Sequence, residues 1–420
     1  INVNRLFNLK MNSLNIISDL KFIKDKIIFL ILILPISLLA GSLVVNINIL
    51  LLIIVFFFDL YKKKKFKIFK NNQIYFLLLI SLYLIFNSIF IGKTEEGMVR
   101  AFGFIRFIFL TLILAYYFNY KKSHYLNTIL KFWFIIFIVV TFDLLFEYLF
   151  GINFLGNKSN YPNRLAGFTG DELKIGGYYF GFILISLSLV FKNYRKFFLP
   201  LLFFFILISF FIGEKSNFFK IIFIFYLLLI ILYYKNYKFW LTSLLAIIIF
   251  VFSINSFNKN VSGKQGIVLH YFQLLNAEGL SYYFKKYSIH YKHYKAAEKI
   301  ISENYIFGIG VKKFRVESFK KKYNPSDDSM RGATHPHQFH YEILSELGLI
   351  GYLLILGFLI NQIYYGLKLY KKTKDILVLS STLFVIANIL PILPSGSFFT
   401  TYTATIFWIN YSFILRNKFA

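Results

Sequence analysis

The stretch QIYFLLLISLYLIFNSIF, residues 73–90, contains eighteen residues and no charged side chain. A helix needs roughly 20 predominantly apolar residues to cross the hydrocarbon core of a bilayer, where each backbone polar group must be satisfied within the helix. The stretches IIFLILILPISLLAG at 27–41 and FWLTSLLAIIIFVFSI at 239–254 have the same character. The sequence therefore predicts an all-α polytopic membrane protein.

The composition of the chain agrees with a membrane protein. Apolar residues make up 58% of the sequence and aromatic residues 21%. The formal net charge of +28 would indicate a nucleic-acid partner in a soluble protein. In a membrane protein we attribute it to lysine-rich cytoplasmic loops and to attraction of anionic lipid, so no nucleic-acid partner is expected. The absence of cysteine excludes disulfides and thiolate metal sites.

The apolar stretches predict about twelve transmembrane helices, and the loops between them predict the orientation. Loops after even-numbered spans are rich in lysine, as in YKKKK at 61–65, whereas loops after odd-numbered spans are not. Because basic residues concentrate in cytoplasmic loops, we expect both termini in the cytoplasm. The expected spans are 27–41, 43–60, 73–92, 101–118, 125–150, 173–191, 197–213, 217–234, 239–257, 346–366, 376–394 and 398–415.

This topology divides the chain into four parts. Residues 1–26 are expected to form a cytoplasmic N-terminal segment, 27–257 the first nine helices, 258–341 an external loop, and 342–420 the last three helices. No cleavable signal peptide is expected. Because the sequence opens with Ile1, Met11 is a candidate for its natural start.

The long external loop is the expected working region. A loop of this length without low-complexity composition is usually functional. Within it, HYKHYKAAEKIISEN at 290–304 is expected to form a helix, with Gly308 and Gly310 as the stop. We expect the loop to fold back over the outer membrane face, because it has too few apolar residues for a core of its own. It holds six of the seven histidines, namely His270, His290, His293, His335, His337 and His340.

The most informative motif is THPHQFHYEILSELGLIGYLLILGF at 334–358, where a histidine-rich segment enters a membrane helix. His337 follows Pro336 and is expected to begin that helix, so we predict it to be a general base, with His335, Glu342 and Glu346 in support. Two alternatives are an interfacial histidine that only bonds lipid headgroups and a three-histidine metal site. No carboxylate or cysteine completes an obvious metal-ligand set, so no metal is expected.

Three further motifs place basic residues on the external side of the membrane. YPNRLAGFTGDELKIGGYYF at 161–180 contains Arg164 in a glycine-rich turn. IGEKSNFFK at 212–220 puts Lys215 at the boundary of a span, where it binds an anion or snorkels to the lipid interface. In YSIHYKHYKAAEKIISENYIFGIGVKKFR at 287–315, a helix, a glycine turn and a basic run suit an anion such as pyrophosphate, or else form a solvated basic face.

These motifs carry four predicted supporting residues. His290 and Arg315 are weaker candidates for binding such an anion than Arg164 and Lys215. Asp171 and Glu172 are predicted to support the site, although a helix cap explains the pair equally well.

In this order and on this side of the membrane, the four motifs resemble the O-antigen ligase and polymerase family over roughly residues 143–358. HPHQ followed by Glu346, Gly348 and Gly351 is similar to that family's histidine-plus-amide motif and glutamate–glycine helix. AAEKIISENYIFGIGVKKFR at 296–315 resembles its loop helix and following glycine turn. The sequence departs from the family at Lys215 and near His290, where arginine is usual.

The resemblance implies a glycosyltransferase in the bacterial inner membrane, with its site facing the periplasm. The implied partners are a polyprenyl-diphosphate-linked glycan as donor and a lipid A-core or growing-glycan hydroxyl as acceptor. It implies His337 as the base, Arg164 and Lys215 as diphosphate-binding cations, and no metal or cofactor. Ligase is our first expectation and polymerase the alternative. A lipid-linked glycan flippase and an inactive family member remain as further alternatives.

The orientation can be tested with reporter fusions. Reporters fused at Lys64 and at Ser318 should report opposite sides of the membrane, because the first follows a lysine-rich loop and the second lies in the external loop. The same side for both would contradict the predicted topology.

Overall fold

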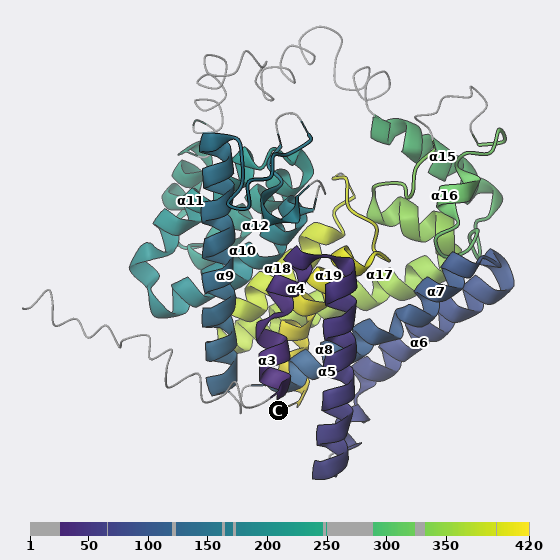
Figure 1. Cartoon of the computed structure of the whole chain (residues 1–420), viewed down its shortest axis with the longest axis horizontal. Coiled ribbons are helices and arrows are strands. Elements are labelled where there is room, and N and C mark those ends of the chain that lie inside the picture. Colours follow the sequence, from purple (N-terminus) through teal and green to yellow (C-terminus); the bar gives the residue numbers. More distant parts are fainter. Residues whose placement is uncertain are drawn as a thin grey trace, which may run out of the picture.

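A computed structural model shows the chain as an assembly of α-helices (Figure 1). The structure describes residues 26–64, 66–119, 123–161, 164–170, 174–246, 249, 289–323, 332–391 and 393–419. Within these residues every regular element is helical and there is no strand, which confirms the all-α prediction.

The helices follow the apolar stretches closely. The first half contains α3 (Lys26–Leu32), α4 (Leu34–Ala40), α5 (Ser42–Lys63), α6 (Asn72–Phe86), the π-helix η3 (Asn87–Gly92), α7 (Glu95–Gly103), α8 (Ile105–Tyr117) and α9 (Ser123–Phe150). The second half contains α10 (Ile175–Asn193), α11 (Phe198–Phe211), α12 (Lys215–Leu232), α15 (Ile289–Glu303), α16 (Phe314–Glu317), α17 (Phe339–Thr373), α18 (Ile376–Asn388) and α19 (Thr401–Leu415).

Seven helical stretches of the described chain are long and apolar enough to cross a membrane, so the protein is a multi-pass membrane protein. They are Ser42–Lys63, Asn72–Gly92, Glu95–Tyr117, Tyr125–Phe150, Ile175–Asn193, Lys215–Leu232 and Phe339–Thr373. Other expected spans coincide with shorter helices, such as α18 with 13 residues and α19 with 15. Only part of the expected span 239–257 lies within the described residues. The total of twelve spans stays a prediction.

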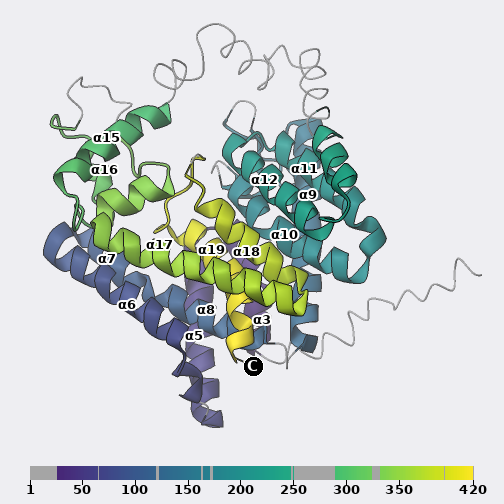
Figure 2. The same cartoon turned by 180° about the vertical axis from the view of Figure 1, so that it is seen from behind.

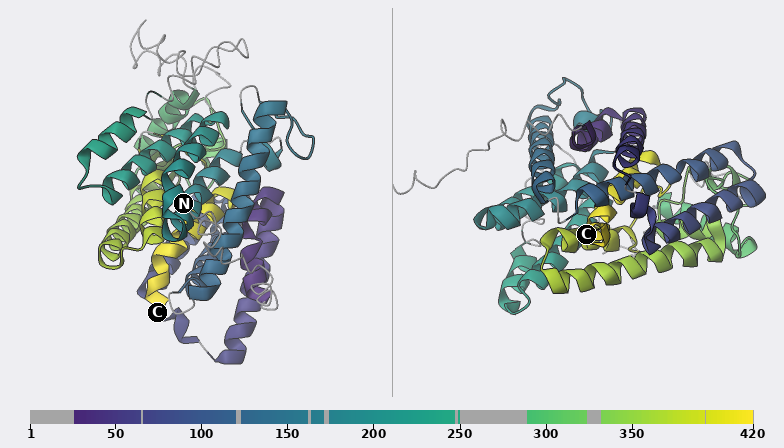
Figure 3. Two further views of the ribbon diagram at one scale, coloured as in Figure 1. Left: turned by 90° about the vertical axis from the view of Figure 1, so that its left-hand side faces the viewer. Right: turned by 90° about the horizontal axis from the view of Figure 1, so that it is seen from below.

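Burial separates a central layer of helices from a peripheral one. Nearly every residue of α10, α18 and α19 is buried. By contrast, α5 and α6 expose large apolar side chains such as Leu43 and Leu82, as expected of surfaces that face lipid. The long α17 runs obliquely beside α6, and seen from below it forms one edge of the molecule while the end of α19 lies near the middle (Figures 2 and 3).

Helix α17 is interrupted inside its candidate span. Gly348 has φ 66° and ψ −170°, which is not helical. The interruption frees backbone groups that would otherwise bond within the helix, and the segment 305–310 binds them. Ile309 N and Gly310 N donate to Ser345 O and Glu346 O at 3.0 and 2.8 Å, and Leu349 N donates to Tyr305 O at 2.8 Å. The loop after α15 is therefore joined to a membrane helix by backbone hydrogen bonds.

A second attachment comes from the π-helix η3. The side chain of Asn87 donates to Phe307 O at 2.7 Å and accepts from Val311 N at 3.1 Å. Gly310 lies so close to η3 that a Cβ on it would stand 2.1 Å from Gly92 Cα. The described part of the external loop thus lies directly on α6, η3 and α17. The fold-back prediction for the whole loop remains a prediction, since much of it is outside the described residues.

The interrupted helix gives a stability prediction. A Cβ on Gly348 would stand 2.3 Å from Ile306 O, and its φ is positive. We expect Gly348→Ala to lower the free energy of unfolding by about 1–3 kcal/mol or more, because strain and a backbone clash act together. Thermal unfolding of the purified protein in detergent measures this.

Gly357→Ala is the matched control, because Gly357 lies in the same helix with nothing within 4 Å of the added Cβ. It should be neutral or stabilising by roughly 0.5–1 kcal/mol, since alanine is the better helix former. Equal effects from the two substitutions would contradict this account of Gly348.

Candidate active site

Four histidine rings gather where α15 meets the segment before α17. His337 is the common member, with its ring centroid 3.9 Å from that of His335, 5.1 Å from His290 and 5.3 Å from His293. His290 and His293 lie on one face of α15, three residues apart. The Nδ1 atom of His290 is buried and accepts no hydrogen bond from the described chain. At least one ring nitrogen of the cluster is therefore buried without a hydrogen-bond partner in the described chain.

The backbone at His337 differs from expectation. The prediction that His337 begins the membrane helix is wrong, because α17 starts at Phe339 with Gln338 as its N-cap. The Gln338 side chain accepts from Tyr341 N at 2.8 Å, so the amide of the HPHQ motif caps the helix. His337 lies before the cap with φ 57°, and its carbonyl accepts from Ser395 N at 2.8 Å. A left-handed residue and a loop contact, rather than a helical turn, set the direction of its side chain.

Burial keeps the clustered imidazoles neutral. Desolvation, followed by the proximity of His335, His290 and His293, lowers the pKa of His337 to about 2. Desolvation and then the charge of Lys312 lower the pKa of His335 to about 3. Burial and the nearby charge of Arg164 also lower the pKa of His290. Without an anion in the site, these rings are therefore free bases at neutral pH.

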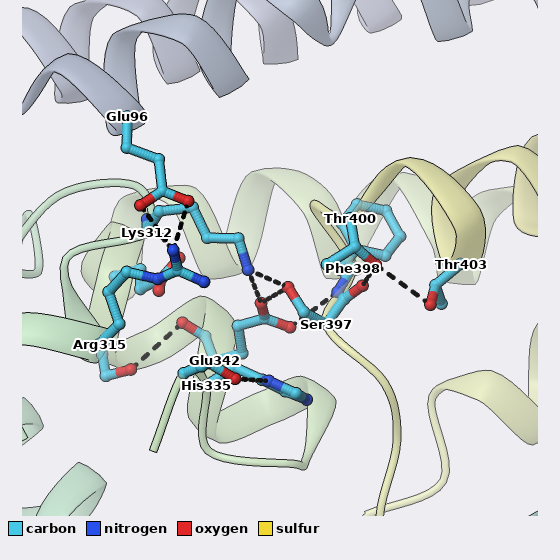
Figure 4. A network of polar contacts seen from close by, with 12 residues as sticks. Glu96, Lys312, Arg315, His335, Glu342, Ser397, Phe398, Thr400 and Thr403 are labelled. Carbon is cyan, nitrogen blue, oxygen red and sulfur yellow. Dashed lines mark hydrogen bonds and ion pairs between the residues drawn. The ribbon is translucent and has the colours of Figure 1, made fainter. Parts of the chain in front are cut away.

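A buried polar network adjoins this cluster at His335 (Figure 4). Glu342 and Lys312 are 1% and 2% exposed, and their charged atoms are 3.8 Å apart. The hydroxyl of Ser397 donates to Glu342 and accepts from Lys312 Nζ. Phe398 N donates to Glu342 at 2.8 Å, and Lys312 N donates to the fully buried Glu346 at 2.8 Å. Glu342 and Glu346 thus hold two loops against the start of α17.

The segment that carries Arg164 is fixed by a different carboxylate. Glu147, from α9, accepts from Ala166 N and Gly167 N at 3.0 and 2.7 Å. Leu165 N donates to Ile212 O at 3.1 Å, which brings Arg164 beside the turn before α12. The positive charge of Arg164 acts on the side chain of His290 and on that of Glu214, which precedes Lys215.

The loop 389–400 connects the two sides of the site. Ser216 donates its hydroxyl hydrogen to Pro394 O, and the next residue, Ser395, donates its N–H to His337 O. Ser216, the residue after Lys215, therefore contacts Pro394, and His337 contacts the next residue, Ser395. This arrangement brings the segments of Arg164, Lys215 and His337 to one end of the helix assembly. Whether their charged ends share one cavity stays a prediction.

The remaining predicted residues have mixed positions. Arg315 pairs with Glu96 of α7, because its Nη1 donates to both carboxylate oxygens at 2.7 Å, so it is engaged within the protein (Figure 4). Asp171 and Glu172 lie outside the described residues. Within the described chain no group of three or more histidine, cysteine, aspartate or glutamate side chains is arranged to hold a metal ion.

Several contributors were not among the predicted site residues, and His293 and Ser397 are two of them. His293 had a signal in the sequence, because it stands three residues after His290 on a predicted helix. Ser397 had none, because a single serine in a loop 55 residues after Glu342 gives no pattern.

Three ionisable residues inside the apolar runs, Arg106, Asp143 and Glu147, have structural partners. Arg106 donates to a backbone carbonyl and to Thr401 at 2.6 and 3.1 Å. Asp143 and Glu147 accept backbone N–H groups from residues 154–167. A carrier would concentrate such groups along a pathway near the membrane midplane. Here they attach neighbouring segments to the helices instead.

The comparison with known families agrees with the motifs. Residues 180–356 match the family model described as O-Antigen ligase. This confirms the resemblance over most of its range, and the matched region holds Lys215, His290, Arg315, His335 and His337, while Arg164 precedes it. No curated protein matches the chain significantly.

The lowered pKa values predict how stability depends on pH. The unfolded chain binds protons at histidines near pH 6.5, whereas the folded protein keeps His335 and His337 neutral. Above pH 6.5 these two rings are neutral in both states, so they cost the folded state no stability. As the pH falls below 6.5, the unfolded state binds protons that the folded state does not, and the folded state loses stability. We expect the melting temperature to fall between pH 6.5 and 5.

The His335→Gln/His337→Gln double variant should show a shallower fall over the same range, because glutamine binds no proton. Melting curves of both proteins in one buffer series provide the measurement. Parallel pH dependences would show that these two rings do not carry the effect.

Proposed function

Starting from an O-antigen ligase domain over residues 180–356, we propose that this chain is a metal-independent membrane glycosyltransferase of the ligase type. It transfers a glycan from a polyprenyl diphosphate to a hydroxyl of a lipid A-core acceptor, at the periplasmic face of the bacterial inner membrane. The observation that carries the proposal is the half-buried His337 at the centre of a neutral histidine cluster, with the charge of Arg164 acting on its neighbour His290.

The reaction needs one base and a stabilised leaving group. The acceptor oxygen forms a bond to the anomeric carbon while the bond from that carbon to the diphosphate oxygen breaks. The electron pair leaves with the polyprenyl diphosphate, and His337 takes the proton of the acceptor hydroxyl. A positioned general base of this kind contributes about a hundredfold to ten-thousandfold in rate.

Arg164 and Lys215 are the cations that we assign to the diphosphate. Fixed positive charge at the leaving group acts most strongly where water is excluded, and it replaces the role of a metal ion. Lys215 acts as a point charge, whereas Arg164 offers a bidentate fork. His290 is a weaker ligand candidate, and Arg315 would have to release Glu96 to take part.

Binding of the donor changes the pKa of His337. Burial lowers the pKa of His337 to about 2, which is low for a general base. Two or more negative charges on a bound diphosphate favour the protonated ring and raise that pKa toward neutrality. The base therefore becomes effective when the donor is present. Glu342 and Glu346, through Lys312 and Ser397, are positioning residues that keep the loops around it in place.

Ligase and polymerase differ in the acceptor, which the described site does not distinguish. Surface glycolipid from a strain that lacks this chain separates them. Loss of all long chains from the lipid core indicates a ligase, whereas a single repeat unit still attached indicates a polymerase. A flippase would instead leave lipid-linked glycan on the cytoplasmic side, and an inactive member would leave the glycolipid unchanged.

The choice of His337 as base is tested by substitution. His337→Ala should lower the rate of glycan transfer by about a hundredfold or more while donor binding is retained, because only proton transfer is lost. His335→Ala should cost much less, although its ring is the nearest to His337. Transfer assays and donor-binding titrations on the two purified variants decide the matter. Equal loss in both, or the reverse order, would refute the assignment.

A further inference from the structure

A cavity of about 850 Å³ lies at the end of the helix assembly opposite the candidate active site. It is formed by the start of α9, the end of α10, the junction between α17 and α18, and the residues after α19. None of the histidines or cations assigned to the candidate active site lines it.

Two central helices connect the candidate active site to this cavity. Helix α10 begins beside Glu214, since a Cβ on Gly176 would touch that carboxylate, and its Lys192 lines the cavity. Helix α19 begins just after Ser397 and is followed by Arg416, which also lines the cavity. The 19 residues of α10 span about 28 Å at 1.5 Å per residue, close to the thickness of a bilayer core. The cavity therefore lies at the opposite membrane boundary.

The polar part of the cavity wall is strongly basic. Lys192, Arg195, Lys374 and Arg416 line it, against one carboxylate, that of Asp375. The carboxylate of Asp375 already has partners, because it accepts hydrogen bonds from Arg416 and from Leu377 N. Lys192, Arg195 and Lys374 are exposed at the rim, and no carboxylate of the described chain lies within ion-pair distance of them. An anion entering here meets a surplus of positive charge.

The rest of the wall is apolar. Leu126 and Leu130 from α9, Leu189 and Phe191 from α10, and Ile376 from α18 line it. A free phosphate ion would leave this surface uncovered, and the cavity is far larger than such an ion. A zwitterionic lipid would leave the basic rim without a matching charge. The combination suits an amphiphile with an anionic head.

We propose that this cavity binds an anionic phospholipid of the leaflet opposite the candidate active site. The phosphate lies among Lys192, Arg195 and Lys374, and the acyl chains lie along Leu126 and Leu130. Basic recesses between membrane helices are a recurrent setting for anionic headgroups. Because residues at the ends of five helices line the cavity, a bound lipid stabilises the folded chain by mass action. This proposal is independent of the transferase activity.

The test uses the full chain purified in a neutral detergent. Dioleoylphosphatidylglycerol should raise the melting temperature by a few degrees and remain bound in native mass spectra. Dioleoylphosphatidylcholine and inorganic phosphate should do neither. Lys192→Glu and Arg195→Glu should each weaken the apparent lipid affinity by about fivefold or more, as expected from the effect of one basic residue near an anionic surface.

Lys238→Glu is the matched control, because it makes the same charge change at an exposed lysine outside the cavity. It should leave the lipid-induced shift unchanged. If a charge-reversal variant melts early without lipid, the neutral Lys192→Gln and Arg195→Gln replace it. Equal shifts with the zwitterionic lipid, a shift from phosphate alone, or the same loss in Lys238→Glu would overturn the proposal.

Discussion

The interruption of α17 at Gly348 is the constraint on which the site depends. An unsatisfied backbone group within a membrane costs several kcal/mol, so an interrupted membrane helix requires a partner for the groups it frees. The segment 305–310 is that partner, through hydrogen bonds to Ser345, Glu346 and Leu349. This pairing requires glycine at 308 and 348, because a Cβ at either would meet backbone within 2.6 Å. It therefore joins α15, and the histidines it carries, to the helix that HPHQ precedes.

The charged groups buried at this junction are one lysine and two carboxylates. Lys312 lies between Glu342 and Glu346, bonded to the first through Ser397 and to the second through its backbone N–H. Buried ions of this kind are costly to desolvate, and loss of one partner is more damaging than loss of the whole set. Such a network contributes a defined geometry rather than net stability. Here it sets the positions of 308–312 and 395–398, and the latter loop holds the carbonyl of His337.

The electrostatic character of the site follows from this geometry. Arg164 adds positive charge near the neutral histidines and also acts on Glu214, whereas Glu342 and Glu346 are bonded to Phe398 and to Lys312. Positive charge beside neutral rings favours an anion. The cavity at the other membrane boundary repeats the preference, because lysine and arginine outnumber the single Asp375 in its wall. One helix assembly thus has cationic side chains near both ends, with a basic cavity at the end that Lys192 and Arg416 line.

The sequence by itself determined the helical class, the positions of most helices, and that the HPHQ segment directly precedes a long apolar helix. Those features are local, because spanning length, hydropathy and motif spacing are properties of neighbouring residues. The tertiary structure alone decided that Gln338 caps α17, that Arg315 pairs with Glu96, and that Ser397 and Asn87 hold the site together. Lys312 and Ser397 are 85 residues apart and Asn87 and Phe307 are 220 apart, so no sequence period links them. Contacts between such distant segments depend on how the helices pack, and that packing is the part that local patterns do not encode.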